Sequence, residues 1–200
     1  MTLLAGAVVA YVIGAIPVGF LVARAFGITD IRTQGSGNIG ASNVLRTAGR
    51  VAGLLTLGGD IVKGYLAATA GATVGGLTPL AASTGAIAAI VGNCWSVFLL
   101  LRGGKGVATG LGALLAVVPL AMLPAALVWL GVAVGSRYVS LASVMAAISV
   151  PLCALAAGYP LAFVGAGAVA AAIVVYRHHE NIARLRAGTE RRLGERRRTA

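Results

Sequence analysis

The amino-acid sequence predicts an all-α integral membrane protein. Of 200 residues, 58% are hydrophobic and 10% are charged, and the mean hydropathy is +0.93. An ordinary soluble domain carries about a quarter charged residues, so this composition excludes that class. The charges stand in short islands between long uncharged stretches, and the 29 glycines suit close helix packing in lipid. We therefore expect one compact bundle, a single domain over 1–200, without a linker or a repeat.

Uncharged stretches define the expected membrane helices. Stretch 1–23 fits one crossing, because a helix needs about 20 apolar residues to span the hydrocarbon core. Stretches 64–101 and 138–176 each fit two crossings, with outer turns suggested at 75–79 and 158–160. The first positive charge follows the first apolar run, so this segment is expected to be a retained helix with its N-terminus outside, not a cleaved signal.

The remaining stretch, 106–136, is assigned two crossings. A single crossing would put Arg137 and the arginine-rich C-terminus outside, whereas two keep every basic residue on the cytoplasmic side, as the positive-inside rule requires. Pro119 and Pro124 divide this stretch into pieces of about 13 residues, roughly 20 Å of helix each. The prediction is a bundle of seven transmembrane segments, the fourth and fifth short. Its C-terminus is cytoplasmic, with a solvated basic tail over 191–200 attracted to anionic lipid.

The first polar island is the glycine-rich turn GSGNIGASNVLRTAG over 35–49. Glycines free backbone N–H groups and a helix start follows, which together favour a bound anion, above all a phosphate. Ser42 and Arg46 are four apart and share a helical face. Ser36 and Arg46 are expected to be catalytic. The substrate-binding candidates of this island are Gly35, Gly37, Asn38, Gly40, Ser42 and Asn43.

GSGNIG also matches G-x-G-x-x-G, with Asp60 about twenty residues further on. We reject a dinucleotide site, because that fold needs a strand before the loop and a membrane helix is expected there. A plain flexible turn is the other alternative, but turns do not need serine, asparagine and arginine at this density. Asp60 and Lys63, three apart, are expected to pair at the membrane interface. Whether 51–59 lies flat or belongs to the second helix stays open.

The second polar island is Arg102-Gly103-Gly104-Lys105-Gly106. It is not a Walker A loop, since Leu99 and Gly106 occupy the positions of the first glycine and of the Ser/Thr. One interpretation makes Arg102 and Lys105 positive-inside anchors. Glycines on both sides of Lys105 favour another, in which the backbone approaches a ligand closely and the ammonium supplies charge. Lys105 is expected to be catalytic, and the substrate-binding candidates are Gly103, Gly104 and Gly106.

The third polar island follows the last apolar stretch, at 176–185. On a helix His178 and Asn181 share one face, whereas His179 and Glu180 turn away. His178 and Asn181 are expected to be catalytic, against the alternative that both histidines are ordinary interface residues.

Two further features carry less weight. In segment 137–143, Ser140 and Ser143 either add hydroxyls to a phosphate site or cap a helix, and Ser143 is the substrate-binding candidate. Cys94 and Cys153 lie in apolar stretches and are expected to be packing residues. No zinc-ligand spacing occurs, so neither a metal nor a cofactor is expected.

Three blocks, GSGNIGASNVLRTAG, GGKGVATGLGALLA and HHENIARLRAGTE, together resemble the bacterial acyl-phosphate-dependent glycerol-3-phosphate acyltransferases, membrane-integral enzymes of the Y type. The likeness covers nearly the whole chain and is specific as a set, and GDIVKG and RYVSLAS also look like family segments. Ser42 stands where the family usually has threonine, which keeps the hydroxyl. Asn93 and Ser96 stand where many members have histidine and proline, so a role for that histidine position is in doubt.

The resemblance implies transfer of a fatty acyl group from acyl phosphate to the 1-hydroxyl of sn-glycerol 3-phosphate. The products are 1-acyl-glycerol 3-phosphate (lysophosphatidic acid) and phosphate, in the first step of phospholipid synthesis at the cytoplasmic face of the bacterial inner membrane. Acyl phosphate is already activated, so the site must mainly position two phosphates and stabilise an oxyanion. Two proton acceptors stay open, His178 or a substrate phosphate oxygen, and we favour the second. Expected partners are the two substrates and membrane lipid, with no nucleic acid, and the protein is expected to act as a monomer.

The main alternative function is an anion or phosphate transporter. Transporters place binding groups near the bilayer midplane and need polar access to both sides, whereas the expected outer half of this chain has almost no ionisable groups. A noncatalytic scaffold that binds anionic lipid through its arginine tail is a third alternative. No H-x-x-x-x-D pair occurs, since Ala183 and Arg184 occupy the fifth positions after the histidines. A covalent acyl-enzyme on Ser36 has little support, because no G-x-S-x-G is present.

Overall fold

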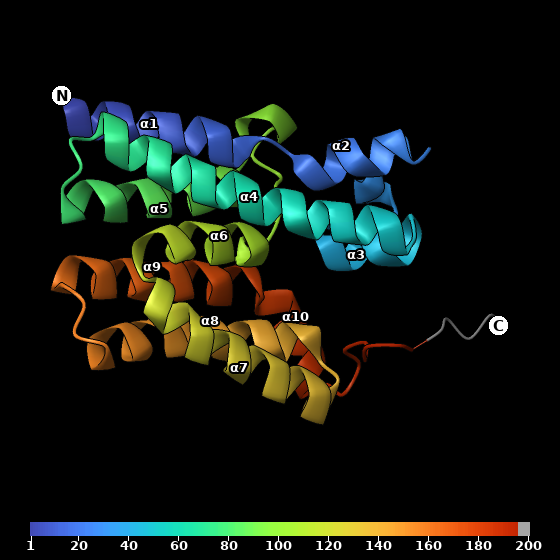
Figure 1. Ribbon diagram of the computed structural model, residues 1–200. Helices are drawn as coiled ribbons and strands as arrows, with labels where there is room; N and C mark the ends of the chain where they lie inside the picture. Colours follow the sequence, from blue (N-terminus) through green and yellow to red (C-terminus); the bar gives the residue numbers. More distant parts are fainter. Residues whose placement is uncertain (196–200) are drawn as a thin grey trace.

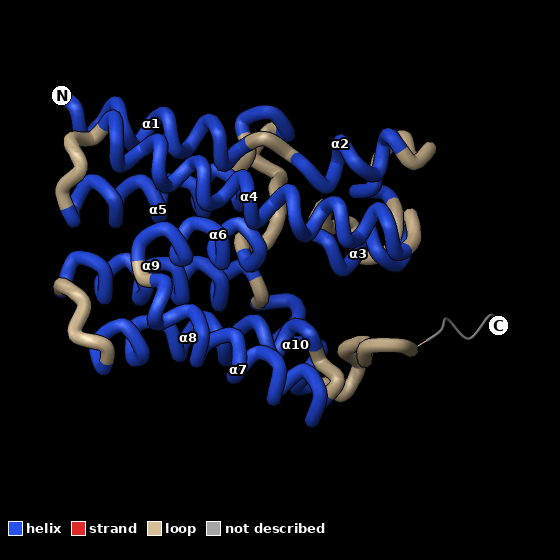
Figure 2. Tube along the Cα trace, in the orientation of Figure 1, coloured by secondary structure: helices blue, strands red, loops and turns tan. Residues whose placement is uncertain are grey.

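The computed structural model describes residues 1–195, and within them the chain is helical and contains no strand (Figures 1 and 2). The all-α prediction is confirmed, and the strand that a dinucleotide fold requires before the GSGNIG loop is absent from this described part. The α-helices are α1 (Thr2–Ala15), α2 (Val18–Ala25), α3 (Ala41–Thr47), α4 (Arg50–Val74), α5 (Pro79–Cys94), α6 (Val107–Val117), α7 (Pro119–Ser136), α8 (Val139–Ala156), α9 (Leu161–Arg177) and α10 (His179–Arg186), and the 3-10 helices are η1 (Ile31–Thr33) and η2 (Val97–Leu99).

Five helical stretches of the described chain are long and apolar enough to cross a membrane. They are Thr2–Ala25, which joins α1 and α2, then α4, Pro79–Leu99, α7 and α8. Helices α9 and α10 meet at a bend of 60° and make a sixth if they form one span, and α6 has only 11 residues. These lengths agree with a polytopic membrane protein. The count of seven crossings and the orientation of the termini stay predictions.

The predicted short fourth segment corresponds to α6, but the expectation that the fifth segment is also short is wrong. Helix α7 has 18 residues and is long enough to span. The helix is interrupted once, directly before Pro119. Pro119 lies in the first turn of α7, where a backbone N–H has no partner inside the helix, so the lack of an N–H in proline costs no hydrogen bond there. Pro124 lies inside the helix, where its cost is limited to one backbone hydrogen bond near the start. Segment 51–59, which the sequence left open, belongs to α4.

Small residues let the helices approach at backbone distance, which confirms the expected use of most glycines. A Cβ placed on Gly14 of α1 would lie 2.3 Å from the Ala89 carbonyl oxygen of α5. A Cβ on Gly112 of α6 would lie 1.9 Å from the Ile61 carbonyl oxygen of α4. In lipid, where apolar side chains gain little by leaving the solvent, such close packing holds helices together. A Gly112→Leu substitution is therefore expected to separate α4 from α6 and abolish folding, measurable as loss of the monodisperse purified protein.

The helices form two layers, which contact each other mainly through α5 and α9, and α6 packs on the first layer and also touches the second (Figure 1). Helices α1, α4 and α5 pack on one side, and α7, α8 and α9 on the other. The N-terminus and the turns after α4 and α8 lie together at one end of the bundle (Figure 2). The polar islands gather at the opposite end, where α2, α3, the start of α4 and α10 lie. This arrangement brings segments distant in the sequence to one polar end.

Candidate active site

The polar end contains a cavity of about 2030 Å³ that continues between the two layers. All five predicted catalytic residues line it, namely Ser36, Arg46, Lys105, His178 and Asn181. Of the predicted substrate-binding residues it is lined by Gly35, Asn38, Gly40, Ser42, Asn43, Gly104, Gly106 and Ser143. Gly37 and Gly103 instead line an adjoining cavity of about 620 Å³, which shares Ser36 and Lys105 with the first. The islands therefore meet in one place.

Asn43 gives the first island its shape. Its side chain is buried, and its amide nitrogen donates to the carbonyl oxygens of Gln34 at 3.0 Å and Asn38 at 2.8 Å. Its amide oxygen accepts from the Ser36 N–H at 2.9 Å. A Cβ on Gly35, whose φ is +62°, would lie 2.2 Å from that oxygen, so only glycine fits beside it. The loop folds around Asn43, which leaves the Ser36 hydroxyl at the cavity wall.

Several of the backbone N–H groups that the sequence offered to an anion are already bonded. The Gly37 N–H donates to the Gln34 carbonyl at 2.9 Å, and the Gly40 N–H to the Asn38 side chain at 2.8 Å. The Gly103 and Gly104 N–H groups donate to the carbonyls of Cys94 at 3.2 Å and Asn93 at 2.9 Å. These amides therefore build the loops. The Ala41 and Ser42 N–H groups in the first turn of α3 have no recorded partner within residues 1–195, so they remain for a ligand together with side-chain donors.

Arg46 and Lys105 are the cations best placed to act as such donors. Arg46 lies on α3 with Nη2 3.5 Å from the Ser36 hydroxyl, at the outer limit of a hydrogen bond. Lys105 donates to the side-chain oxygen of Asn181, its one recorded partner among residues 1–195. An ammonium has three N–H groups, so two are left for substrate. Burial, and after it the positive charge of Arg184, lower the pKa of Lys105.

Arg177 holds the second island through its glycine carbonyls, and nothing in the sequence singled it out. Its Nε donates to the Gly104 carbonyl at 3.1 Å and its Nη2 to the Gly103 carbonyl at 3.2 Å. The guanidinium also lies over the Trp95 ring, 5.5 Å from the centroid. Because Arg177 directly precedes His178, it connects the loop that carries Lys105 to the third island.

His178 stands at the bend between α9 and α10, with its side chain buried. Its Nδ1 lies 2.7 Å from the Val174 carbonyl oxygen. A carbonyl only accepts, so Nδ1 carries the proton and Nε2 has a free lone pair. Burial lowers the pKa of His178 to about 4. The imidazole is therefore neutral at physiological pH, while His179 and Glu180 are exposed, as predicted.

Glu190 is the site residue that sequence reasoning missed. Its carboxylate accepts from the Asn181 side-chain amide at 2.6 Å, the Ser140 hydroxyl at 2.7 Å and Arg184 Nε at 2.7 Å. Burial works to raise the pKa of Glu190, but these three hydrogen bonds lower it below its ordinary value. Lys105, Asn181 and Glu190 thus form one bonded row. The signal was present in the third block, in which Glu190 follows a glycine turn after α10.

The serines of α8 differ in what they can offer. The Ser140 hydroxyl is bonded to Glu190, although the sequence favoured Ser143. The Ser143 hydroxyl donates to the Val139 carbonyl at 2.8 Å and accepts from Trp129 Nε1 at 3.3 Å. Ser143 therefore lines the cavity with its hydroxyl proton already bonded to the helix backbone.

Residues 191–195 are exposed, as expected of a solvated tail, but they are also bonded to the rest of the fold. The Leu193 N–H donates to the Arg137 carbonyl at 2.7 Å, and Arg137 Nη2 donates back to the Leu193 carbonyl at 2.7 Å. Arg192 Nε donates to the Tyr138 hydroxyl at 3.2 Å. These contacts fasten the segment that carries Glu190 to the turn between α7 and α8. Residues 196–200 lie outside the described part of the chain.

Away from the polar end the cavity becomes apolar. It extends along α8 from Ser143 to Val150, which is about 10 Å of helix. Leucine, methionine and small side chains line this part, among them Leu114, Met122, Ala125, Ala147 and Ala170. The cavity therefore joins a basic mouth to an apolar interior. No group of three or more His, Cys, Asp or Glu side chains within residues 1–195 is arranged to hold a metal ion.

The fold and this cavity define a helical membrane protein with a cationic site open to an apolar groove, and its relatives have the same architecture. The chain matches the family model described as glycerol-3-phosphate acyltransferase over residues 4–188. It is 51% identical over 189 residues to glycerol-3-phosphate acyltransferase 2 of Moorella thermoacetica, covering 94% of this chain and 96% of that protein. It is 47% identical over 184 residues to the glycerol-3-phosphate acyltransferase of Geobacter sulfurreducens, covering 92% and 94%. The protein belongs to the glycerol-3-phosphate acyltransferase family.

Solved structures agree with this assignment. The crystal structure of PlsY, an integral membrane glycerol 3-phosphate acyltransferase, in its glycerol 3-phosphate form superposes with a TM-score of 0.90 at 40% identity. That alignment covers 97% of this chain and 96% of the other. The lysophosphatidic acid form of PlsY gives a TM-score of 0.89 at 39% identity. This chain is therefore an integral membrane protein with the PlsY fold.

Proposed function

We propose that this protein transfers a fatty acyl group from acyl phosphate to the 1-hydroxyl of sn-glycerol 3-phosphate, giving 1-acyl-glycerol 3-phosphate and phosphate. The observation that carries the proposal is that Ser36, Arg46, Lys105, His178 and Asn181, from three distant islands, line one cavity that runs from a basic mouth to an apolar interior. One substrate has a fatty chain and the other is a small dianion. A cavity of this shape supports the proposal, because its mouth suits a phosphate and its interior suits a fatty chain.

The site's charge suits two phosphates held close together. Lys105 keeps two N–H groups for substrate, and the Arg46 guanidinium has only its long contact with Ser36 within the described residues. Each cation offers charge-assisted hydrogen bonds, and together they offset the repulsion between the phosphates. The Ser36 hydroxyl, beside Arg46, is placed to donate to the oxyanion that develops on the acyl carbonyl.

The transfer itself needs one proton acceptor. The substrate hydroxyl oxygen attacks the acyl carbon, the bond from that carbon to the phosphate oxygen breaks, and phosphate leaves with the bonding electrons. The hydroxyl proton goes to a phosphate oxygen, whose second pKa is about 6, or to His178 Nε2. The pKa of about 4 makes His178 the weaker base of the two. We therefore assign the proton to phosphate and give His178 a hydrogen-bonding part in placing glycerol 3-phosphate with Asn181.

This assignment makes a prediction for pH dependence. Because burial lowers the pKa of His178, the imidazole stays neutral as pH falls from 8 to 6. A histidine base with the ordinary pKa of about 6.5 would lose activity over that interval. We expect the His178→Gln variant to keep more than about a tenth of parent turnover, with the same pH profile as the parent from 6 to 8. A profile whose acid limb near pH 6.5 vanishes in the variant would assign the base to His178.

The donor is tested directly. Purified protein is incubated with glycerol 3-phosphate and, separately, acyl phosphate, acyl-CoA or acyl-acyl carrier protein, without added metal. We expect lysophosphatidic acid from acyl phosphate alone. The transport alternative is tested by reconstituting the same preparation in vesicles, where phosphate uptake without acyl transfer would overturn the proposal. We further propose that the polar end faces the cytoplasm of a bacterial cell and that the monomer is active, since one described chain supplies every named site residue.

A further inference from the structure

A buried polar cluster made by Asp60, Lys63 and Asn93 lies where α1, α4 and α5 meet, and the proposed chemistry does not use it. Each of the three is 6% exposed. Charges buried among membrane helices are costly and are retained mainly where they serve function. From their spacing in the sequence, we expected Asp60 and Lys63 to pair at the membrane interface. They do pair, with Asp60 Oδ1 2.8 Å from Lys63 Nζ, but inside the bundle.

Protein oxygens surround the ammonium of Lys63. Its ammonium donates to the Ile16 carbonyl at 2.8 Å and to Asn93 Oδ1 at 2.9 Å, and the Asp60 carboxylate completes its surroundings as an ion pair. Three oxygens therefore surround a group that has three N–H bonds. The Ile16 carbonyl stands at the break between α1 and α2, where Pro17 has no N–H. Lys63 thus ties this break to the end of α5.

Asn93 connects Lys63 to the loop that carries Lys105. Its side-chain oxygen accepts from Lys63, and its backbone oxygen accepts from the Gly104 N–H at 2.9 Å. A Cβ on Gly103 would lie 2.1 Å from the Asn93 carbonyl oxygen, and one on Gly104 would lie 2.9 Å from Asn93 Nδ2. Both glycines therefore rest directly on Asn93. The Asn93 carbonyl is one of the last in α5 and has no partner within the helix, so its direction sets the position of the loop.

We propose that Asn93 is a positioning residue for Lys105, and that Lys63 holds Asn93 in place. The inference rests on the proposed function, because it assigns the cluster a part in that reaction. Lys63 fixes the Asn93 side chain, the Asn93 carbonyl fixes Gly104, and Gly104 places the next residue, Lys105, against Asn181. Misplacement of a catalytic group by about 1 Å lowers rates by about 100-fold. The loop is therefore held by Asn93 at the Gly104 N–H and by Arg177 at the Gly103 and Gly104 carbonyls.

The test compares Asn93→Leu, which has nearly the same shape without hydrogen bonding, with Asn93→Asp, which keeps an oxygen for Lys63. Ser83→Ala is the control, since Ser83 is equally buried and bonded to the Ala162 carbonyl at 3.0 Å, far from the loop. We expect Asn93→Leu to lower kcat 10- to 100-fold with KM for glycerol 3-phosphate within about threefold of the parent. Asn93→Asp is expected to recover kcat to within about fivefold, and Ser83→Ala to match the parent.

Hydrogen exchange gives a readout that does not depend on activity. In Asn93→Leu the amides of 102–106 should exchange at least tenfold faster than in the parent, while those of α8 and α9 stay unchanged. Parent-like kcat and exchange in this variant, or an equal loss of kcat in Ser83→Ala, would overturn the inference. If Asn93→Leu does not fold, Asn93→Ala is measured in the same way. If the parent chain is inactive, the proposed function is wrong, and the hydrogen-exchange comparison alone then tests whether the cluster positions the loop.

Discussion

Replacing Lys105 with alanine is expected to lower kcat/KM at least about 100-fold. The ammonium offers two N–H groups to substrate beyond its bond to Asn181, and a hydrogen bond to a charged group contributes about 1.5–3 kcal/mol. Two such contacts amount to about 3–6 kcal/mol, and each 1.36 kcal/mol is tenfold in rate. Arg46→Ala is expected to lose activity by a similar mechanism. The measurement is lysophosphatidic acid formation by purified, folded variants.

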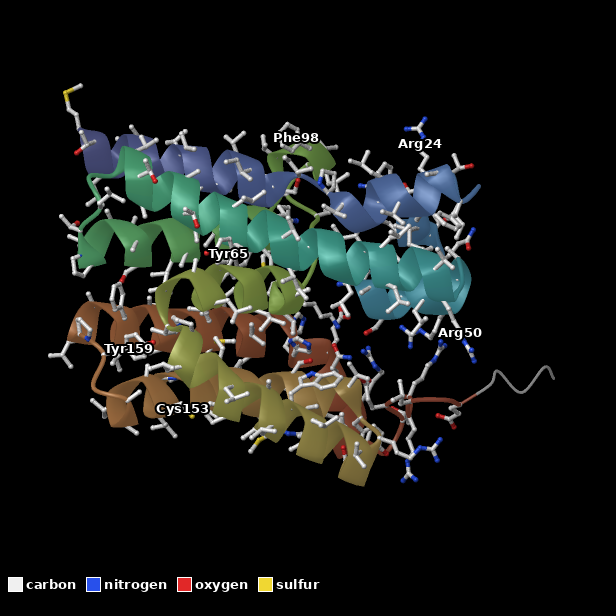
Figure 3. All side chains as sticks on the ribbon, in the orientation of Figure 1. Arg24, Arg50, Tyr65, Phe98, Cys153 and Tyr159 are labelled. Atoms are coloured by element: carbon white, nitrogen blue, oxygen red, sulfur yellow. The ribbon has the colours of Figure 1, made fainter. Side chains whose placement is uncertain are left out.

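Arg24→Ala is the matched control, because Arg24 is an exposed cation on α2 that points away from the cavity (Figure 3). It should keep parent activity, which separates a specific contact from a general loss of positive charge. Unimpaired turnover in both Lys105→Ala and Arg46→Ala would contradict the proposed site.

In the parent, the lowered pKa of Lys105 means that its charge is lost as pH rises through a value below 10.5. We therefore expect an alkaline limb of activity that begins below the pH at which free lysine titrates.

Replacing Glu190 with glutamine is expected to lower kcat about 10- to 100-fold and to destabilise the protein. The carboxylate accepts from Asn181, Ser140 and Arg184, whereas a glutamine at this position turns an NH2 group toward these donors. Asn181 would lose the bond that orients it toward Lys105. Glu180→Gln is the matched control, because Glu180 lies 3.9 Å from the same Arg184 but its side chain is 69% exposed. It should match the parent within about twofold.

Thermal unfolding against pH tests the charge of Glu190 separately. Its pKa is lowered in the folded protein, so its contribution to stability is present above the ordinary value of 4.5 and is lost as pH falls through the folded pKa. The parent should therefore lose stability over this acid interval, and Glu190→Gln should lose less. Equal acid sensitivity and equal turnover in the parent and Glu190→Gln would show that the bonded row does not orient Asn181.

The sequence was sufficient for those features that depend on local composition. Uncharged stretches predicted the apolar helices, and glycine clusters beside charge selected the loops that line the cavity, down to all five proposed catalytic residues. The helix lengths in 106–136 were harder to predict from the sequence. A proline in the first turn of a helix costs little, whereas a proline inside a helix usually ends or kinks it. Sequence alone cannot distinguish these two positions. The result was a fifth segment predicted too short.

Contacts between distant segments were beyond the sequence. The amides of Gly103 and Gly104 looked free for a ligand, yet their partners are carbonyls at the end of α5. Glu190 carried no sequence prediction, yet residues 192 and 193 fasten its segment to the α7–α8 turn.

Composition and local motif thus determined by themselves that this chain is a helical membrane protein with glycine-rich polar loops, since hydropathy and glycine content act within one segment. Only the tertiary structure decided which donors remain available to a substrate. A hydrogen-bonding group is free or occupied according to what lies opposite it in space, and that partner can be far away along the chain, as Asn181 is from Lys105 at a separation of 76 residues.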